Sequence, residues 1–305
     1  MKTASSKRDV IIIGGGPGGM SAAVWCADLG LKPLLIERNS RLGGQMLWTH
    51  NPVTNYLGFV AENGLELAAK FASHVERSDV ETLTGRAITH VDLADRSVSL
   101  DDDSFTAGAI VIATGVRRRK LGIQGETEFA GRGVLSSGAG ERESVCDKTV
   151  VIVGGGDAAI ENALILGEFA REVYVVHRRN ELSARDEFID RAQRAPNVEL
   201  ILDSVVKEIV GTKTVERVVI ANRAGNTREL DVDNILIRIG VEPNSELFAG
   251  QIDLDERGFI EVDREFLTRQ RNVYAIGDIV SGSAPTIPNA IGSGSAVAKN
   301  ILSTA

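Results

Sequence analysis

The sequence predicts an α/β protein made of two similar units, the second inserted into the first, each with a parallel sheet and a small antiparallel β-meander. Two observations lead to this prediction. Residues 10–19 and 150–159 are nearly the same sequence, a short β-branched run that opens into a glycine-rich turn. The residues after each turn then repeat one succession of strand-like and helix-like segments. A chain of 305 residues with 43% hydrophobic side chains is long enough to bury two such cores.

The first unit should alternate strands and helices before it reaches its meander. Its expected elements are strand 10–13, helix 17–29, strand 33–37, a loop over 39–60, helix 64–77, short strands 87–93, 97–100 and 104–107, and a buried strand 109–115. The second unit repeats this plan. Its expected elements are strand 149–153, helix 157–170, strand 172–177, a helix near 184–194, strands around 198–210, 215–222 and 228–231, and a closing strand 234–240.

The remaining tail is too short for a third unit of this kind. It offers one strand at 271–278 and one helix near 290–302. We therefore expect the tail to return to the first unit, with polar, turn-prone crossings near 116–122 and 240–246. The expected domains are a discontinuous one over 1–118 and 244–305, and an inserted one over 119–243.

The glycine turns have the spacing of a Rossmann-like dinucleotide-binding unit. Gly14 permits a tight turn, Gly16 lets the backbone approach a pyrophosphate, and Gly19 allows close packing of helix on strand. The helix that begins near Pro17 directs free N–H groups and the positive end of its dipole at the phosphates. The second turn repeats this pattern with Gly154, Gly156 and Ala159.

The two units differ in charge where their second strand ends. Glu37 can accept hydrogen bonds from a ribose 2′-hydroxyl and repels a 2′-phosphate. Arg178 and Arg179, which follow His177, match the geometry of a phosphate instead, although two adjacent arginines can also be a solvated surface pair. One acidic and one basic ending predict two different dinucleotides on one chain. A flavoprotein that exchanges electrons with a nicotinamide is the leading hypothesis.

Composition excludes several other classes of function. A net charge of −8 argues against nucleic acid as a partner. No apolar stretch approaches the roughly 20 residues that span a bilayer. The first residues have no apolar segment of a signal peptide, so a cytoplasmic location is expected.

The cysteines and histidines form no metal-binding pattern, and no metal is expected. Cys26 falls on the helix face that should pack on the sheet, where it is expected to be a small buried apolar group. Cys146 lies in a polar segment and is expected to be exposed.

Besides the two glycine turns and His177-Arg178-Arg179, the sequence contains the motifs Gly43-Gly44-Gln45, Ala113-Thr114-Gly115 and Ala275-Ile276-Gly277-Asp278. Through these motifs the sequence resembles, from about residue 8 to 303, the low-molecular-weight thioredoxin reductase family, in which the first domain holds FAD and the second NADPH. The resemblance implies FAD contacts from Gly14, Gly16, Pro17, Gly18, Gly19, Glu37, Arg38, Gly44, Gln45, Asn55, Ala87, Ala113, Thr114, Gly115, Gly277, Asp278, Ile287 and Ala290. It implies NADPH contacts, with NADH as the alternative, from Gly154, Gly156, Asp157, Ala158, Ala159, His177, Arg178, Arg179, Arg185 and Gly240.

The chain departs from this family at the redox centre. In thioredoxin reductases a CxxC pair receives electrons from the flavin, whereas Ser137 and Gly140 stand at those two positions here. A hydroxyl cannot form a reversible disulfide, so the usual disulfide relay is excluded and no catalytic residue is assigned. A second departure concerns the nucleotide, because the family's third arginine is Ser183 and the nearest basic replacement is Arg185.

Members without the CxxC resemble the thioredoxin-reductase-like ferredoxin/flavodoxin–NADP⁺ reductases. The expected chemistry is hydride transfer between NADPH and FAD, followed by electron transfer to ferredoxin or flavodoxin. The inserted domain is expected to rotate on its two crossings, and the family suggests a homodimer. The basic run 117–120 could dock an acidic carrier, although such a run is more often a solvated turn. The chain ends soon after its last helix, so Trp48, Tyr56 or a partner subunit is expected to cover the flavin.

Three alternatives remain open at this stage. The protein could be an NAD(P)H-dependent reductase or oxidase of a small molecule such as a quinone, oxygen or free flavin. It could act on thiols or disulfides through an unconventional cysteine. It could also be a flavin-binding regulatory protein without turnover.

Overall fold

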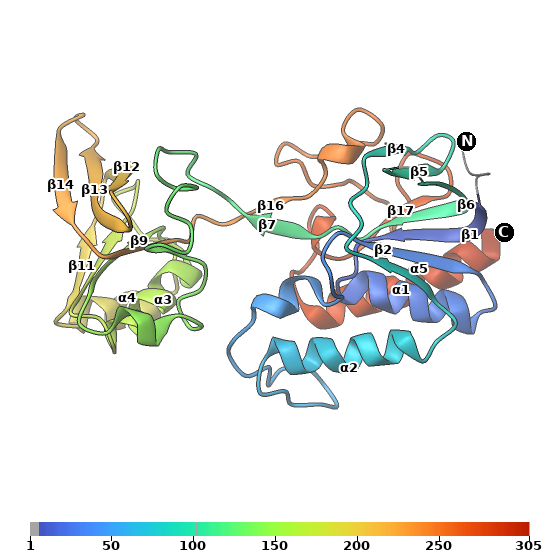
Figure 1. Cartoon of the computed structure of the whole chain (residues 1–305), viewed down its shortest axis with the longest axis horizontal. Coiled ribbons are helices and arrows are strands. Elements are labelled where there is room, and N and C mark those ends of the chain that lie inside the picture. The colour runs from blue at the N-terminus through green and yellow to red at the C-terminus, as the bar shows by residue number, and fades with distance from the viewer. Residues whose placement is uncertain (1–5, 102, 305) are drawn as a thin grey trace. The chain divides into compact units, whose positions relative to one another are not determined.

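The computed structural model describes residues 6–101 and 103–304 (Figure 1). Its contacts divide the chain into a first unit, Met1–Arg117 with Glu242–Ala305, and a second unit, Arg118–Val241. The chain leaves the first unit through β7 (Val116–Arg118) and returns through β16 (Val241–Pro243), and these two strands pair with each other. The second unit is therefore an insertion in the first.

The first unit is built on a seven-stranded sheet in the order β3-β2-β1-β6-β5-β4, with β17 also paired to β6. Its parallel strands are β1 (Ser6–Ile13), β2 (Pro33–Glu37), β3 (Glu81–Thr84), β6 (Asp103–Ile112) and β17 (Val273–Ala275). The meander adds β4 (His90–Asp92) and β5 (Ser97–Leu100) in antiparallel pairing. All five residues of β2 are buried, as expected for a strand covered on both faces.

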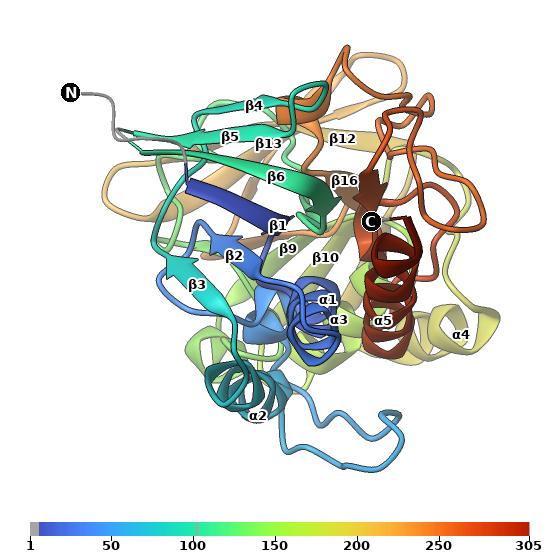
Figure 2. The same cartoon turned by 90° about the vertical axis from the view of Figure 1, so that its right-hand side faces the viewer.

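Three helices cover one face of this sheet, namely α1 (Pro17–Asp28), α2 (Gly64–Glu76) and α5 (Ile287–Thr304) (Figures 1 and 2). Helices α1 and α5 pack closely because glycines lie where they touch. A Cβ on Gly294 would come within 2.6 Å of the carbonyl oxygen of Gly18. The 3₁₀ segments of this unit are η1 (Gly44–Trp48), η3 (Glu246–Phe248) and η4 (Gly277–Ile279).

The second unit repeats the plan with a five-stranded parallel sheet in the order β11-β10-β9-β15-β8. Its strands are β8 (Val134–Leu135), β9 (Thr149–Val153), β10 (Glu172–Val176), β11 (Val198–Ile201) and β15 (Asn234–Ile237). One face packs on α3 (Asp157–Gly167) and α4 (Asp186–Arg194). The other packs on an antiparallel meander of β12 (Ser204–Gly211), β13 (Val215–Asn222) and β14 (Thr227–Asp231), and η2 (Arg142–Val145) precedes β9.

The predicted fold class is confirmed, while several element boundaries are wrong. The two strands expected at 104–107 and 109–115 form the single strand β6, because Gly108 continues the extended backbone beside β1. The helix expected over 157–170 ends at Gly167, where Nδ2 of Asn197 donates to the Gly167 carbonyl at 2.9 Å. The last helix begins earlier than expected, at Ile287, because Oγ1 of Thr286 accepts from the amide of Asn289 at 3.3 Å. Among helices of the described chain, none is long and apolar enough to cross a membrane.

Candidate functional site

The first glycine turn is tightly packed at Gly14 and Gly19 and is open only at Gly16, where the protein backbone is expected to approach a ligand. Gly14 has φ of +112°, and a Cβ there would lie 2.4 Å from the Ala113 carbonyl oxygen. A Cβ on Gly19 would lie 1.9 Å from the carbonyl oxygen of Gly14, which explains why α1 can pack against β1. Gly16, by contrast, is the N-cap of α1. A Cβ on Gly16 would have the Cα of Gly44 as its nearest atom, at 3.9 Å. The amino end of α1 is therefore open at Gly16, as an anion site requires.

Glu37 is held at the end of β2 by three hydrogen bonds. The amide of Gly15 donates to its Oε2 at 2.7 Å, and the backbone N and Nδ2 of Asn39 donate to its Oε1 at 2.8 and 2.7 Å. The side chain is 5% exposed. A carboxylate has about four acceptor sites, so one on Oε2 remains for a ribose hydroxyl.

A hydrogen-bonded bridge forms behind the turn and includes a residue that the sequence interpretation did not assign. Oγ1 of Thr114 donates to the carbonyl of Asn244 at 2.9 Å, and Nδ2 of Asn244 donates to the Thr114 carbonyl at 2.8 Å. The amide of Asn244 also donates to the carbonyl of Gly115 at 3.0 Å. Nearby, Nε2 of Gln45 donates to the carbonyl of Val116 at 2.6 Å. Asn244 thus ties the returning chain to the Thr114–Gly115 turn.

Asp278 lies in η4, near the amino end of α5. It is half-buried, and burial raises the pKa of its carboxyl. Its carboxylate accepts no hydrogen bond from residues 6–101 or 103–304. Gly277 has φ of +72° and a Cβ there would be 3.5 Å from that of Ala290, in the first turn of α5 after Ile287. A polar ligand with hydroxyl groups would satisfy this carboxylate.

The other residues assigned to this site are less constrained. The side chains of Arg38, Asn55 and Ala87 are exposed, and Gly18 contributes to the contact between α1 and α5. Trp48, in η1, is 59% exposed. Tyr56 packs edge-on against Phe71, with ring centroids 5.7 Å apart.

The second glycine turn repeats the geometry of the first. Gly154 has φ of +147°, and a Cβ there would lie 2.2 Å from the carbonyl oxygen of Arg238. Gly156 is the N-cap of α3, and a Cβ there would come no closer than 3.7 Å to Oγ of Ser183, so its approach is open. Ala159 is fully buried and takes the place of the third glycine. Asp157 and Ala158 complete the first turn of α3, and Gly240, with φ of +95°, follows β15.

His177 lies directly under this turn. A Cβ on Gly155 would be 2.4 Å from Cε1 and Nδ1 of the imidazole. The side chain is 8% exposed, and its Nε2 is buried with no hydrogen-bond partner among the described residues. Burial, followed by the nearby charge of Arg179, lowers the pKa of His177, so the ring is neutral at pH 7.

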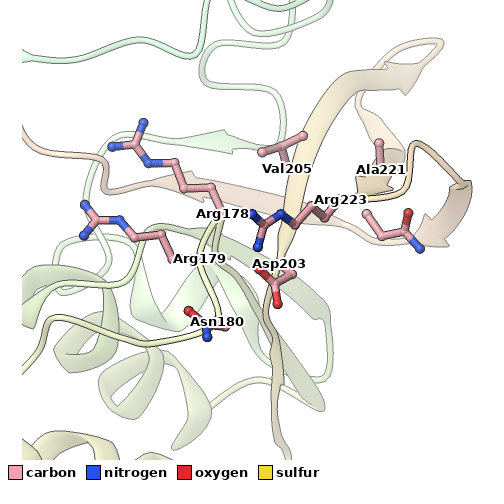
Figure 3. A pocket seen from close by; sticks show the side chains of 8 residues that line it. Arg178, Arg179, Asn180, Asp203, Val205, Ala221 and Arg223 are labelled. Carbon is pink, nitrogen blue, oxygen red and sulfur yellow. The ribbon is translucent and has the colours of Figure 1, made fainter.

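Arg178 and Arg179 line a cavity of about 360 Å³ within the second unit (Figure 3). The same cavity is lined by Asp203, after β11, and by Arg223, after β13. Sequence reasoning did not find Arg223, because nothing in its turn-like surroundings links it to a residue so far away in the chain. We call this space the arginine pocket.

The structure does not bring Arg185 to the arginine pocket. Its amide and Nε donate to the carboxylate of Asp157 at 2.7 and 3.0 Å, and its guanidinium stacks 4.2 Å from the ring centre of Phe188. Arg185 therefore joins the beginnings of α3 and α4.

Residues 136–140, where the family has its CxxC, form a closed turn. One carboxylate oxygen of Glu141 accepts from the amide and Oγ of Ser136 and from the amide of Ser137, at 2.7–2.8 Å. Oγ of Ser137 accepts from the amide of Gly140 at 3.1 Å. Guanidinium groups of Arg118 and Arg238 donate to the Ser136 carbonyl. These bonds hold a polar turn that contains no sulfur.

Neither cysteine supplies the missing redox pair. Cys26 is buried in α1 and Cys146 is exposed after η2, and both are free. No group of side chains in residues 6–101 and 103–304 is arranged to hold a metal.

The basic run at 117–120 is largely bound within the protein. Arg117 pairs with Glu242 at 2.8 Å and also with Glu246, while Nε of Arg119 donates to the Val241 carbonyl at 3.0 Å. These contacts leave less of the run free to dock a carrier.

The two sites fit two dinucleotides of different kind. In the first unit, the open N-cap at Gly16, the partly satisfied Glu37 and Asp278, which has no hydrogen-bond partner among the described residues, suit FAD. In the second, the open N-cap at Gly156 and the arginine pocket suit a phosphorylated adenine dinucleotide.

Comparisons with known proteins agree with this geometry. Residues 8–294 match the model of the pyridine nucleotide-disulphide oxidoreductase family. The chain is 33% identical to the thioredoxin reductase of Mycolicibacterium smegmatis, covering 97% of this chain and 96% of the relative. It is 32% identical to a 34.2 kDa protein in a rubredoxin operon of Clostridium pasteurianum, covering 95% and 94%. The crystal structure of Lactococcus lactis thioredoxin reductase superposes with a TM-score of 0.85 at 34% identity, covering 97% and 98%.

Proposed function

This chain belongs to the pyridine nucleotide-disulphide oxidoreductase family, as an FAD-dependent NAD(P)H oxidoreductase of the thioredoxin reductase type, and we propose that it transfers electrons from NADPH to ferredoxin or flavodoxin. When bound, FAD supplies the exchange between two-electron hydride transfer and one-electron transfer. In balance, one NADPH reduces two one-electron carriers and yields NADP⁺ and a proton. The protein's own residues bind and orient the reactants.

Residues of the first unit would hold FAD in the proposed enzyme. Gly16 and the amino end of α1 face the pyrophosphate, and the free acceptor site on Glu37 binds a ribose hydroxyl. Asp278, half-buried and without a hydrogen-bond partner among the described residues, would accept hydrogen bonds from hydroxyls of the ribityl chain. The amino end of α5, at Ile287–Ala290, would stabilise the negative charge of a reduced flavin through the positive end of the helix dipole.

Residues of the second unit would bind the nicotinamide dinucleotide. Gly156 opens the amino end of α3 to its pyrophosphate, and Arg178 and Arg179 in the arginine pocket bind the 2′-phosphate that distinguishes NADPH from NADH. His177 is neutral beneath the turn and adds no charge of its own.

The turn at 136–140 is the main support for the proposal that electrons leave the flavin for an external acceptor. Ser137 and Gly140 cannot form a disulfide, and Glu141 holds the turn closed through three hydrogen bonds. Cys26 is buried, and burial raises the pKa of its thiol to about 12, so it is no nucleophile at pH 7. The Clostridium pasteurianum relative, named for a rubredoxin operon, also supports a protein electron carrier as acceptor. We further propose that the protein is a homodimer, as its resemblance to the thioredoxin reductase family implies.

An anaerobic titration tests this function. The FAD-loaded protein is mixed with NADPH and the flavin absorbance near 450 nm is followed, after which ferredoxin, flavodoxin, a quinone, oxygen and a disulfide are added separately. We expect NADPH to bleach the flavin, and ferredoxin or flavodoxin to restore the colour fastest. Restoration by quinone or oxygen alone would show a small-molecule reductase. Restoration by the disulfide would show thiol chemistry, and an unbleached flavin with either NADPH or NADH would show a protein without turnover.

A further inference from the structure

We propose that Arg223 is the third cation for the 2′-phosphate of NADPH, in place of the family arginine that is Ser183 here. Arg223 follows β13 and lines the arginine pocket together with Arg178 and Arg179, which follow β10; in Figure 3 its side chain extends toward the end of β10, whereas the side chains of Arg178 and Arg179 extend away from it. The three guanidinium groups therefore come from two segments of the second unit that are distant in sequence. This inference rests on the proposed function, because it refines how the same nucleotide is recognised.

The three arginines of the pocket have no carboxylate partner in the part of the chain that the structure describes. In residues 6–101 and 103–304, no ion pair involves Arg178, Arg179 or Arg223. Other arginines of the same meander do pair, since Arg217 contacts Glu229 at 3.1 Å and Arg228 contacts Glu199 at 3.9 Å. The chain has 42 acidic against 34 basic residues, so carboxylates are not scarce. Three arginines that line one cavity and form no ion pair with the described residues indicate a site for an anion.

The turn that carries Arg223 is fixed by its own hydrogen bonds. Oδ1 of Asn222 accepts from the amides of Ala224 and Asn226, each at 3.0 Å, and Gly225 adopts φ of +86°. The amide of Asn222 also donates to the carbonyl of Asn226 at 3.0 Å. The backbone of Arg223 is therefore held at the rim of the pocket, and only its side chain must adjust to a ligand.

The two residues that sequence comparison offers for this role are placed elsewhere. Ser183 is neutral, and its Oγ and amide both contact the Gly155 carbonyl. Arg185 is held by Asp157 and Phe188. Arg223 is the remaining guanidinium on the pocket wall, and Asp203 is the one carboxylate among the lining residues. A dianionic phosphate is thus attracted by three positive charges and opposed by one negative charge.

Binding of two nucleotides to the FAD-loaded protein tests the role of Arg223 without turnover. Calorimetry would compare 2′,5′-ADP, which carries the 2′-phosphate, with 5′-AMP, which lacks it. Arg223→Gln should weaken 2′,5′-ADP by about 10- to 100-fold, the usual effect of losing one charge-assisted hydrogen bond, and leave 5′-AMP within about twofold. Asp203→Asn should tighten 2′,5′-ADP selectively. Arg228→Gln, which removes a paired arginine of the same meander, should change neither affinity.

The outcomes separate this inference from the proposed function. If the unmodified protein binds 2′,5′-ADP no better than 5′-AMP, the assignment of NADPH itself is wrong. If the unmodified protein discriminates and Arg223→Gln discriminates equally well, the inference about Arg223 is wrong and the NADPH assignment stands. Equal weakening of both nucleotides by Arg223→Gln would show a general structural role and would also overturn it. Circular dichroism of each variant checks that the fold is kept.

Discussion

The amide of Gly15 donates a 2.7 Å hydrogen bond to Oε2 of Glu37, which joins the first glycine turn to the end of β2. The other carboxylate oxygen accepts both donors of Asn39. The bond from Gly15 is buried and Glu37 is 5% exposed, so the Gly15 amide is shielded from water and depends on the carboxylate. Glu37, which is expected to distinguish a ribose hydroxyl from a 2′-phosphate, therefore also supports the glycine turn that is expected to bind the pyrophosphate.

We predict that Glu37→Gln destabilises the protein as well as weakening FAD binding. The amide keeps the size of the side chain but replaces one acceptor oxygen with a donor, which then faces another N–H group. The free energy of unfolding should fall by about 1–3 kcal/mol, measured by urea denaturation of the protein with and without FAD. Glu62→Gln is the matched control, since Glu62 is exposed, and should change stability by less than about 0.5 kcal/mol. Equal stability of both variants would contradict the prediction.

We predict that His177 makes the protein less stable in acid. Burial and the charge of Arg179 lower its pKa below the ordinary value of 6.5, so the unfolded chain binds a proton more readily than the folded one. Above pH 6.5 both states are neutral and stability is unaffected. As pH falls from 6.5 through the lower folded pKa, stability is lost, by at most about 1.4 kcal/mol per pH unit. Urea denaturation between pH 7.5 and 5 should show a steeper loss for the natural protein than for His177→Gln, and parallel curves would refute the assignment.

Features encoded by local sequence were predictable, and those that depend on distant partners were not. The glycine turns and the strands that lead into them follow from apolar runs and glycine spacing, which act over a few residues. The edge strand β3 was missed because Glu81–Thr84 is polar and half-exposed, without a buried run. Early helix initiation at Ile287 was predictable, since threonine followed two residues later by proline is a start signal.

The site residues divide in the same way. Glu37 ends β2 and His177 directly follows β10, and their places follow from these positions alone. Asn244 reaches Thr114 and Arg223 reaches the arginine pocket only through the tertiary fold. Arg185 was expected to bind the nucleotide because it lies close in sequence to the position of the family's third arginine. In the structure its guanidinium binds Asp157 instead.

We predict that only Cys146 reacts with a thiol reagent in the folded protein. Cys146 is exposed, whereas Cys26 is 0% exposed and burial raises its pKa from 9.0 to about 12. Titration with an aromatic disulfide at pH 8 should release one equivalent of thiolate from the native protein and two in guanidinium chloride. Cys146→Ala should abolish the native signal and leave bleaching of the flavin by NADPH unchanged. Loss of acceptor reduction in Cys146→Ala, with bleaching unchanged, would instead revive a thiol mechanism.

The pKa of Cys26 also predicts how stability changes in alkali. Below pH 9.0 both folded and unfolded states keep the thiol proton, so the group contributes no pH dependence. Between pH 9.0 and about 12 the unfolded chain releases its proton while the folded protein retains it, so stability falls. Cys26→Ala should remove this part of the alkaline loss in a urea series from pH 8 to 10.5. An unchanged alkaline slope in that variant would contradict burial of the thiol.

We predict, finally, that the turn at 136–140 supports structure without relaying electrons. A Cβ on Gly138 would lie 2.0 Å from Oδ1 of Asn162, whose Nδ2 donates to the Ala158 carbonyl at 2.6 Å. Gly138→Ala must therefore displace Asn162 and break that bond, at a cost of about 1–3 kcal/mol. In the double variant with Asn162→Ala the clash is relieved, so the two changes should couple by about 1 kcal/mol or more in a double-mutant cycle. Well below the melting temperature, flavin bleaching and carrier reduction by Gly138→Ala should match those of the natural protein. A selective loss of carrier reduction with unchanged bleaching would place this turn on the electron path after all.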